Sequence, residues 1–138
     1  MLRVKTRLAP SEIHCIGLFA AEFIAKGTIT WQRDPEFDFA YDEAALESVP
    51  PPVKEQFLKY SYFDFDLRQF VLCSDDQRFM NHSENPNICS TPEHDRALVD
   101  IASGEELFCD YTKYERGWFE RRGLKRELFK RLPGRPDI

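Results

Sequence analysis

The alternation of apolar and polar residues along the chain predicts many short strands. Leu2, Val4 and Thr6 alternate with basic residues, which is the two-residue period of a half-buried strand. Other short apolar runs, bounded by turn residues, also have the length of strands. They cover residues 17–20, 28–31, 70–73, 97–101 and 107–111. The sequence therefore predicts a domain dominated by β structure.

A helical region is predicted in the middle of the chain. Asp42 can cap a helix over residues 43–49. The prolines at 50–52 end this helix and can start a second one over residues 53–60. Together with the strands, these helices indicate an α+β fold that is mainly β.

The tail carries a second helical signal. Thr112 and Glu115 form a capping-box pattern. Apolar residues then recur near helical spacing, at Tyr114, Trp118, Leu124, Leu128 and Leu132. Gly117 and Gly123 each weaken such a helix by roughly 1 kcal/mol relative to alanine, so we expect it to bend or break.

The composition is that of one globular domain. A length of 138 residues, a 42% apolar fraction and 12 Phe residues can supply a single core. No stretch approaches the roughly 20 apolar residues of a membrane helix. His14 and Glu22 interrupt the apolar run near the start, which argues against a secretory leader. We expect a soluble, cytoplasmic protein without a membrane partner.

Charge is unevenly distributed around a formal net value of -5. Residues 34–47 hold six acidic residues and no Lys or Arg, whereas residues 116–135 are rich in Lys and Arg. Solvated faces explain both stretches most simply. Alternatively, the acidic stretch attracts a basic peptide. The negative net charge argues weakly against nucleic-acid binding, and we expect no direct contact with nucleic acid.

The four cysteines do not form a metal-binding pattern. They stand at positions 15, 73, 89 and 109, with no CxxC and no His pair at ligand spacing. We therefore expect no metal. Scattered single cysteines also fit a reducing compartment better than a disulfide framework.

A polar segment at residues 81–87, with the sequence NHSENPN, is the main candidate for chemistry. Its Asn and Ser side chains can bond the backbone locally, and Phe79 and Met80 anchor it in a core, so it can hold a small polar ligand. Taken alone, it could equally be an ordinary Asx-rich turn. A glycosylation sequon at Asn81 is irrelevant without a leader, and a hydrolase pair at His82 and Ser83 lacks a nucleophile elbow.

Two further blocks change that interpretation. Upstream, SEIHCIGLFA at 11–20 precedes IAKG at 24–27; downstream, GEEL at 104–107 leads to Asp110 and Tyr111. In this order and spacing, the blocks resemble the SET domain of protein lysine methyltransferases, and most closely the minimal SET proteins of bacteria and large viruses. The resemblance covers residues 2–119. It implies a β-clip fold with a pseudoknot, a variable insert over 34–67 and a C-terminal helical extension over 112–132.

The resemblance implies a site for S-adenosylmethionine. Asn81 would lie near its amino group and the backbone of His82 at the adenine edge, with Arg78 and Phe79 bordering the pocket. We also hypothesise that Trp118 stacks near the adenine. Packing of the tail helix, including packing in a homodimer, is the alternative role of that residue.

The turn Cys15-Ile16-Gly17 would contact the amino-acid end of the cofactor through its backbone. The family usually has glycine where Cys15 stands. Because a side chain there restricts φ, this turn can have a different conformation.

The resemblance also implies the reacting groups. Tyr111 resembles the family's catalytic tyrosine, which aligns a neutral lysine amine with a sulfonium methyl in a dry channel. Tyr60 and Tyr62 stand where such enzymes place channel aromatics, although core packing explains them as well. Cys109 occupies the position at which Phe or Tyr influences the number of methyl groups added, and we expect di- or trimethylation. No general base is evident in the sequence.

The predicted function is therefore S-adenosylmethionine-dependent methylation of lysine ε-amines in a protein substrate. A basic, histone-like or DNA-associated protein fits the acidic stretch, while ribosomal proteins or the chain itself are equally allowed. The alternative is a non-catalytic β-clip or SET-like module that serves for binding or as a scaffold.

Overall fold

The computed structural model describes residues 1–125 and is built from short elements. In chain order they are β1 (Thr6–Pro10), β2 (Ile16–Ala20), β3 (Ile29–Gln32), β4 (Phe39–Tyr41), α1 (Glu43–Glu47), α2 (Pro51–Tyr60), β5 (Ser61–Asp64), β6 (Gln69–Leu72), the 3-10 helix η1 (Asp76–Phe79), β7 (Asn81–His82), β8 (Ile88–Ser90), β9 (His94–Ala97), β10 (Phe108–Cys109), α3 (Tyr111–Tyr114) and α4 (Trp118–Arg121). The predicted α+β, mainly β fold is confirmed.

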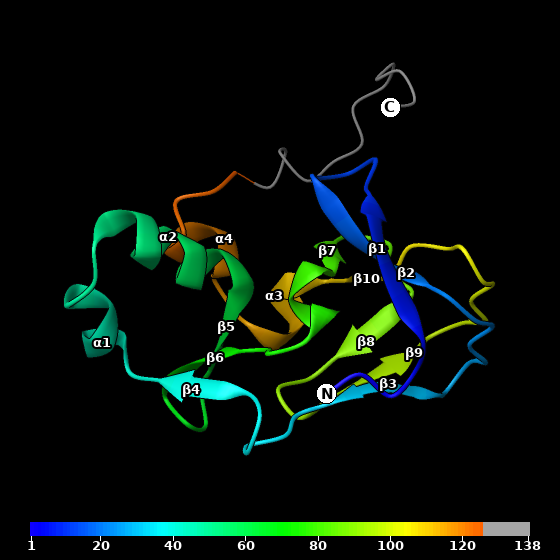
Figure 1. Ribbon diagram of the computed structural model, residues 1–138, viewed down its shortest axis with the longest axis horizontal. Helices are drawn as coiled ribbons and strands as arrows, with labels where there is room; N and C mark the ends of the chain where they lie inside the picture. The colour runs from blue at the N-terminus through cyan, green and yellow to red at the C-terminus, as the bar shows by residue number, and fades with distance from the viewer. Residues whose placement is uncertain (126–138) are drawn as a thin grey trace.

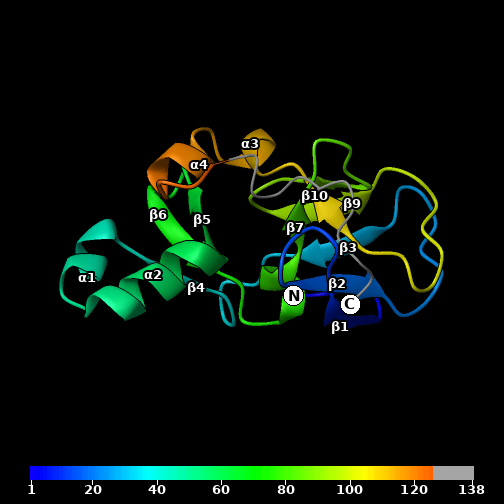
Figure 2. The same cartoon turned by 90° about the horizontal axis from the view of Figure 1, so that it is seen from above.

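The strands form three small sheets. The largest has the order β3-β9-β8-β10-β7, while β1 pairs with β2, and β6 lies between β4 and β5. Most pairs are antiparallel, but β10 runs parallel to both β7 and β8. Figures 1 and 2 show α1, α2, α4 and the β4-β6-β5 sheet at one end, and β1, β2, β3, β8 and β9 at the other. The elements β7, β10 and α3 lie between these two ends.

Two predicted strands are displaced along the chain. The first strand is Thr6–Pro10, not residues 2–6, and Leu2 makes only an isolated bridge with Trp31. The strand predicted at 97–101 is His94–Ala97, and Ile101 bridges Ile24 instead. Leu2, Val4, Ala97 and Ile101 pack on the core as predicted, whereas Leu98 and Val99 are exposed. The position of the partner strand decides which backbone groups pair.

The tail forms two short helices, not one. Gly117, with φ 77, is left-handed and separates α3 from α4. Asp110, not Thr112, caps α3 by accepting from the Thr112 amide, and Tyr111 is the first residue of this helix and not part of a strand. The capping box was therefore wrong. Leu128 and Leu132 lie outside the described residues.

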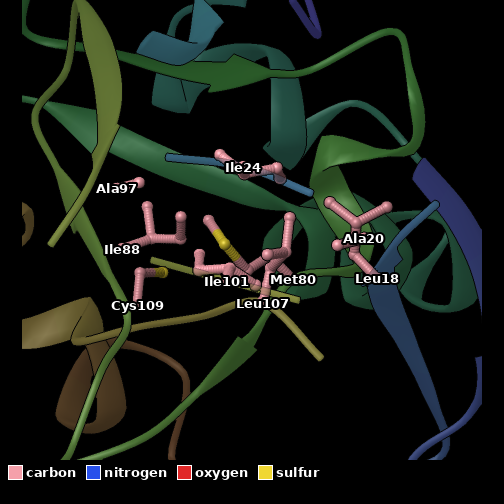
Figure 3. Packing of buried hydrophobic residues seen from close by; sticks show 9 residues of the cluster. All are labelled: Leu18, Ala20, Ile24, Met80, Ile88, Ala97, Ile101, Leu107 and Cys109. Carbon is pink, nitrogen blue, oxygen red and sulfur yellow. The ribbon is translucent and has the colours of Figure 1, made fainter. Parts of the chain in front are cut away.

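Nine buried side chains make up the main core, between the β1-β2 sheet and the largest sheet (Figure 3). They are Leu18, Ala20, Ile24, Met80, Ile88, Ala97, Ile101, Leu107 and Cys109. Met80 therefore anchors the polar segment that follows it, as the sequence predicted. A second cluster around Trp31, Tyr62 and Val71 joins the largest sheet to the β4-β6-β5 sheet.

Candidate functional site

The parallel pairing of β7 with β10 brings two sequence blocks together. Asn81 lies opposite Phe108 and His82 opposite Cys109. The amide of Ser83 donates to the carbonyl of Cys109 at 3.0 Å, and the amide of Tyr111 donates to Nδ1 of His82 at 3.1 Å. Because a ring nitrogen of buried His82 accepts a hydrogen bond from the first amide of α3, the start of α3 is fixed against β7.

Tyr111 is held in place at its hydroxyl. The hydroxyl donates to the carbonyl of Met80 at 2.6 Å. Its ring centroid lies 4.5 Å from that of Trp118. Burial raises the pKa of Tyr111 well above its ordinary value, so the hydroxyl stays protonated near neutral pH. The Tyr111 hydroxyl can therefore act as a hydrogen-bond donor near neutral pH.

Asn81 holds the turn around Cys15. Its Nδ2 donates to the carbonyls of His14 and Ile16 at 3.1 and 3.2 Å, and to Oε1 of Glu106 at 3.0 Å. A buried amide that contacts two carbonyls of one turn fixes the path of that turn. In the structure, then, this amide orients protein backbone.

The turn itself is strained at Cys15. Its φ of 46 places a residue with a side chain in the left-handed region, where glycine is favoured. At Gly17, by contrast, an added Cβ would overlap the carboxylate of Glu106, which would have to move from its present position. That carboxylate also accepts from the hydroxyl of Ser11 at 3.1 Å.

Glu106 and Ser11 thus support the candidate site, and the sequence did not single them out. Burial raises the pKa of Glu106, and its bonds to Asn81 and Ser11 oppose that rise. The signal was present in the sequence, because Glu106 belongs to the GEEL block and Ser11 to the upstream block. Neither pattern, however, reveals that the two side chains meet.

A cavity of about 500 Å³ opens beside this turn. This size suits a small-molecule cofactor. Its walls come from the Cys15 turn, α2, η1, β7 and the tail: His14, Cys15, Ile16, Glu55, Leu58, Lys59, Tyr60, Phe79, Asn81, Tyr111, Trp118, Arg122 and Leu124. The lining therefore includes most of the residues predicted to bind a cofactor. Gly17, Arg78 and His82 are not in it, although Gly17 and His82 support residues that are.

A second cavity of about 60 Å³ is also lined by Tyr111. All three predicted channel residues, Tyr60, Tyr62 and Cys109, line it, and so does Arg78. Both cavities share four wall residues: Lys59, Tyr60, Tyr111 and Trp118. The two cavities are therefore neighbours that share these four residues, Tyr111 among them.

The tail is tied to the helical insert through a buried ion pair. Arg122 donates to Glu115 Oε1 at 2.7 Å, to the carbonyl of Leu58 at 2.5 Å and to that of Ser61 at 2.6 Å. Glu115, which is fully buried, also accepts from the amide of Phe63 at 2.8 Å. These bonds fix α4 against α2 and β5, although both residues look like surface charges in the sequence.

The same arginine holds Trp118 in place. The Arg122 guanidinium lies 4.3 Å from the centroid of the Trp118 ring, which also contacts Tyr111. Only 4% of Trp118 is exposed, and it lines both cavities. The indole is thus a fixed wall between the two cavities.

The model of the SET domain family matches residues 16–112. The chain belongs to the SET-domain family. Among curated proteins no sequence matches it. Membership of this family explains both the motif blocks and the fold, and the resemblance seen in the sequence is confirmed.

Solved structures show the same fold. One is a Plasmodium falciparum protein described as a candidate histone methyltransferase, with 18% identity, a TM-score of 0.58, and coverage of 80% of this chain and 95% of that one. Another is Chaetomium thermophilum polycomb repressive complex 2, autoinhibited and bound to S-adenosylmethionine, with 22% identity, a TM-score of 0.63, and coverage of 86% and 16%. The SET domain described here thus spans a small part of that complex's chain.

The acidic stretch of this SET domain is largely used for its own structure. Asp38 is buried and accepts from the amides of Asp34 and Ser74. Asp34 caps the amide of Glu36. Asp42 and Glu47 bond Gln69 and Lys54, respectively. Neutralising these carboxylates would therefore disturb the fold as well as the charge.

Within residues 1–125, no group of three His, Cys, Asp or Glu side chains is placed to hold a metal ion. Over the same residues, every helix is too short or too polar to cross a membrane.

Proposed function

We propose that this SET domain transfers methyl groups from S-adenosylmethionine to the ε-amine of lysine in a protein substrate. The observation that carries the proposal is the wall that the two cavities share, which includes Tyr111. A methyl donor in the larger cavity and a lysine in the smaller one would face each other there. Membership of the SET family supports the same reaction class.

The residues of the larger cavity fit the proposed cofactor. The backbone of the turn from His14 to Ile16 offers polar groups for an amino-acid moiety, and the rings of Trp118 and Phe79 offer apolar walls for a base. Bound there, S-adenosylmethionine would supply an electrophilic methyl group. Asn81 and Glu106 would act on the cofactor indirectly, because they hold the turn in its conformation.

The smaller cavity fits a lysine side chain. Tyr60 and Tyr62 provide aromatic walls that accept an alkyl chain and attract a cationic head. The Tyr62 hydroxyl is fixed by donating to the carbonyl of Pro92 at 2.8 Å. Tyr111, protonated and bonded to Met80, borders the junction, where it can align the amine.

Cys109 bears on the number of methyl groups added. Its buried side chain lines the smaller cavity, two residues before Tyr111. A thiol is smaller than the Phe or Tyr ring of the family and cannot pin a water as a phenol does. We therefore propose that the site accommodates di- and trimethyl-lysine.

A basic, histone-like protein is the proposed substrate class, and the cytoplasm the proposed location. One structural neighbour is described as a candidate histone methyltransferase. Glu36 and Glu43 are exposed, so part of the acidic stretch remains available to a basic peptide. All four cysteines are free, which supports a reducing compartment.

Radiolabelled methyl transfer onto a lysate from the source cells, followed by identification of the labelled protein, tests the proposal. Tyr111→Phe is the matched control because it removes one hydroxyl and keeps the ring. We expect labelling by the wild type and a loss of at least tenfold in the variant. A wild type that binds no cofactor in calorimetric titration would instead support the non-catalytic module.

A further inference from the structure

Asp95 is a carboxylic acid in the interior of the domain. It lies on β9, between Trp31 of β3 and Ser90 of β8, and only 2% of it is exposed. Gln77 of η1 donates from Nε2 to its Oδ2. Asp95 lines the smaller cavity together with Cys109 and Tyr111, and it is the only carboxylate in that lining among residues 1–125.

The same cavity is lined by a second polar group, whose unused hydrogen-bonding capacity indicates that a ligand binds there. The indole Nε1 of Trp31 is buried and has no hydrogen-bond partner within residues 1–125. Trp31 lines the cavity beside Asp95 and is 2% exposed. A cavity of about 60 Å³ exceeds the ~10–15 Å³ that one water needs. A carboxyl, an amide and an indole N–H thus border a space that can hold water and a polar head group.

The ionisable groups around Asp95 leave it as the proton acceptor near neutral pH. Burial raises the pKa values of Tyr62, Cys73, Cys109, Tyr111 and Tyr114, so all five stay protonated. Burial raises the pKa of Asp95 itself to about 7, and the hydrogen bond from Gln77 and the attraction of the N-terminal ammonium group oppose that rise. The other charged wall residues, Lys59 and Arg78, are cations.

We propose that Asp95 is the proton acceptor of the lysine channel. This inference rests on the proposed function and adds the base that the sequence did not reveal. A lysine enters as an ammonium ion, whose nitrogen has no free electron pair with which to attack a methyl group. The Asp95 carboxylate attracts this cation and takes its proton through water in the cavity.

Each methyl transfer requires the loss of one proton from the lysine nitrogen. One N–H bond of the ammonium breaks, an O–H bond forms on the carboxyl, and the amine nitrogen keeps the electron pair. That pair then forms the N–C bond while the methyl–sulfur bond breaks and its electrons go to sulfur. The carboxylic acid returns its proton to bulk water. A methylated ammonium can lose its next proton by the same route.

The pH profile of kcat/KM at saturating S-adenosylmethionine tests this role, with the wild type compared with Asp95→Asn. Asparagine keeps the size of the side chain and an acceptor for Gln77. We expect wild-type activity to rise towards pH 7 and then level off. The variant should lose at least tenfold at pH 7 and recover steadily towards pH 10, as the lysine deprotonates by itself. A loss by the same factor at every pH, or no loss, would overturn the proposal.

A second variant keeps the test decisive if Asp95→Asn folds poorly. Gln77→Leu removes the donor to Asp95 and retains the carboxyl, so the acidic limb of the profile should move to higher pH. An unmoved limb would count against Asp95. Thermal unfolding and cofactor affinity of each variant report separately on folding and on the larger cavity. If the wild type transfers no methyl group at any pH, the proposed function fails, whereas activity with parallel pH profiles defeats only the role of Asp95.

Discussion

At the scale of single residues, Cys15 pays a conformational cost within the turn that borders the larger cavity. Left-handed backbone costs a residue with a side chain roughly 1–2 kcal/mol. The surrounding bonds from Asn81 hold it there. A side chain at this position therefore raises the energy of the turn, which the sequence alone could not decide.

Replacing Cys15 by glycine should therefore stabilise the domain. We expect Cys15→Gly to raise the free energy of unfolding by about 1 kcal/mol, measured by urea denaturation. Cys89 is the matched control because it is also exposed but lies in β8, outside the left-handed region. Cys89→Gly should destabilise by a similar amount. Destabilisation by both substitutions would show that the Cys15 turn is not strained.

Asp95 should make the stability of the protein depend on pH. Its pKa rises from 3.8 to about 7 on folding, so between these values the folded chain holds a proton that the unfolded chain releases. Wild-type stability therefore falls as pH rises from 4 to 7 and is level above. The advantage of Asp95→Asn over the wild type should grow across that window, to an upper limit of roughly 4 kcal/mol. An advantage that does not change with pH in denaturation titrations would contradict this.

At the scale of elements, the sequence predicted what local patterning controls. Strands β2 and β6 overlap the apolar runs of the sequence, and helix α2 begins at the prolines. Strand β5 directly follows α2 and was not predicted. Strands β7 and β10 have two residues each and owe their existence to a parallel pairing between distant segments. No local period predicts such a pairing. Only the resemblance to the family brought Asn81 and Tyr111 into one site.

The burial of charged residues could not be predicted from the sequence, for a related reason. Asp95, Glu115 and Arg122 stand among polar neighbours, where they resemble solvated residues. Their burial follows from contacts with partners far along the chain. Glu115 even completed a false capping box with Thr112.

The contact between the tail and the insert should depend on Arg122. Arg122→Met leaves the fully buried carboxylate of Glu115 with its main partner removed, and we expect a loss of 3–5 kcal/mol of unfolding free energy. Lys54→Met is the control, because the exposed pair of Lys54 and Glu47 should contribute about 0–1 kcal/mol. Chemical denaturation measures both. Equal losses would mean that the buried pair does not anchor the tail.

At the scale of the whole molecule, the larger cavity joins the two ends seen in Figure 1. Its walls come from the turn between β1 and β2, from α2 in the insert, and from α4 with the residues after it. These three segments are far apart in the sequence. A ligand that contacts all of them would stabilise their mutual arrangement, whereas the β3-β9 pair lies outside the lining.

Binding of S-adenosylhomocysteine, which fills the site without reacting, should therefore slow hydrogen exchange in three segments together: residues 13–17, α2 and α4. The wild type at a ligand concentration 100 times Kd should gain about 2.7 kcal/mol of stability. Trp118→Ala opens the wall shared by both cavities, so it should weaken binding and reduce protection in all three segments. Exchange in β3 and β9 serves as the internal reference. Protection confined to residues 13–17 would mean that the tail and the insert do not take part in binding, and an unchanged affinity in Trp118→Ala would remove the indole from the cofactor site.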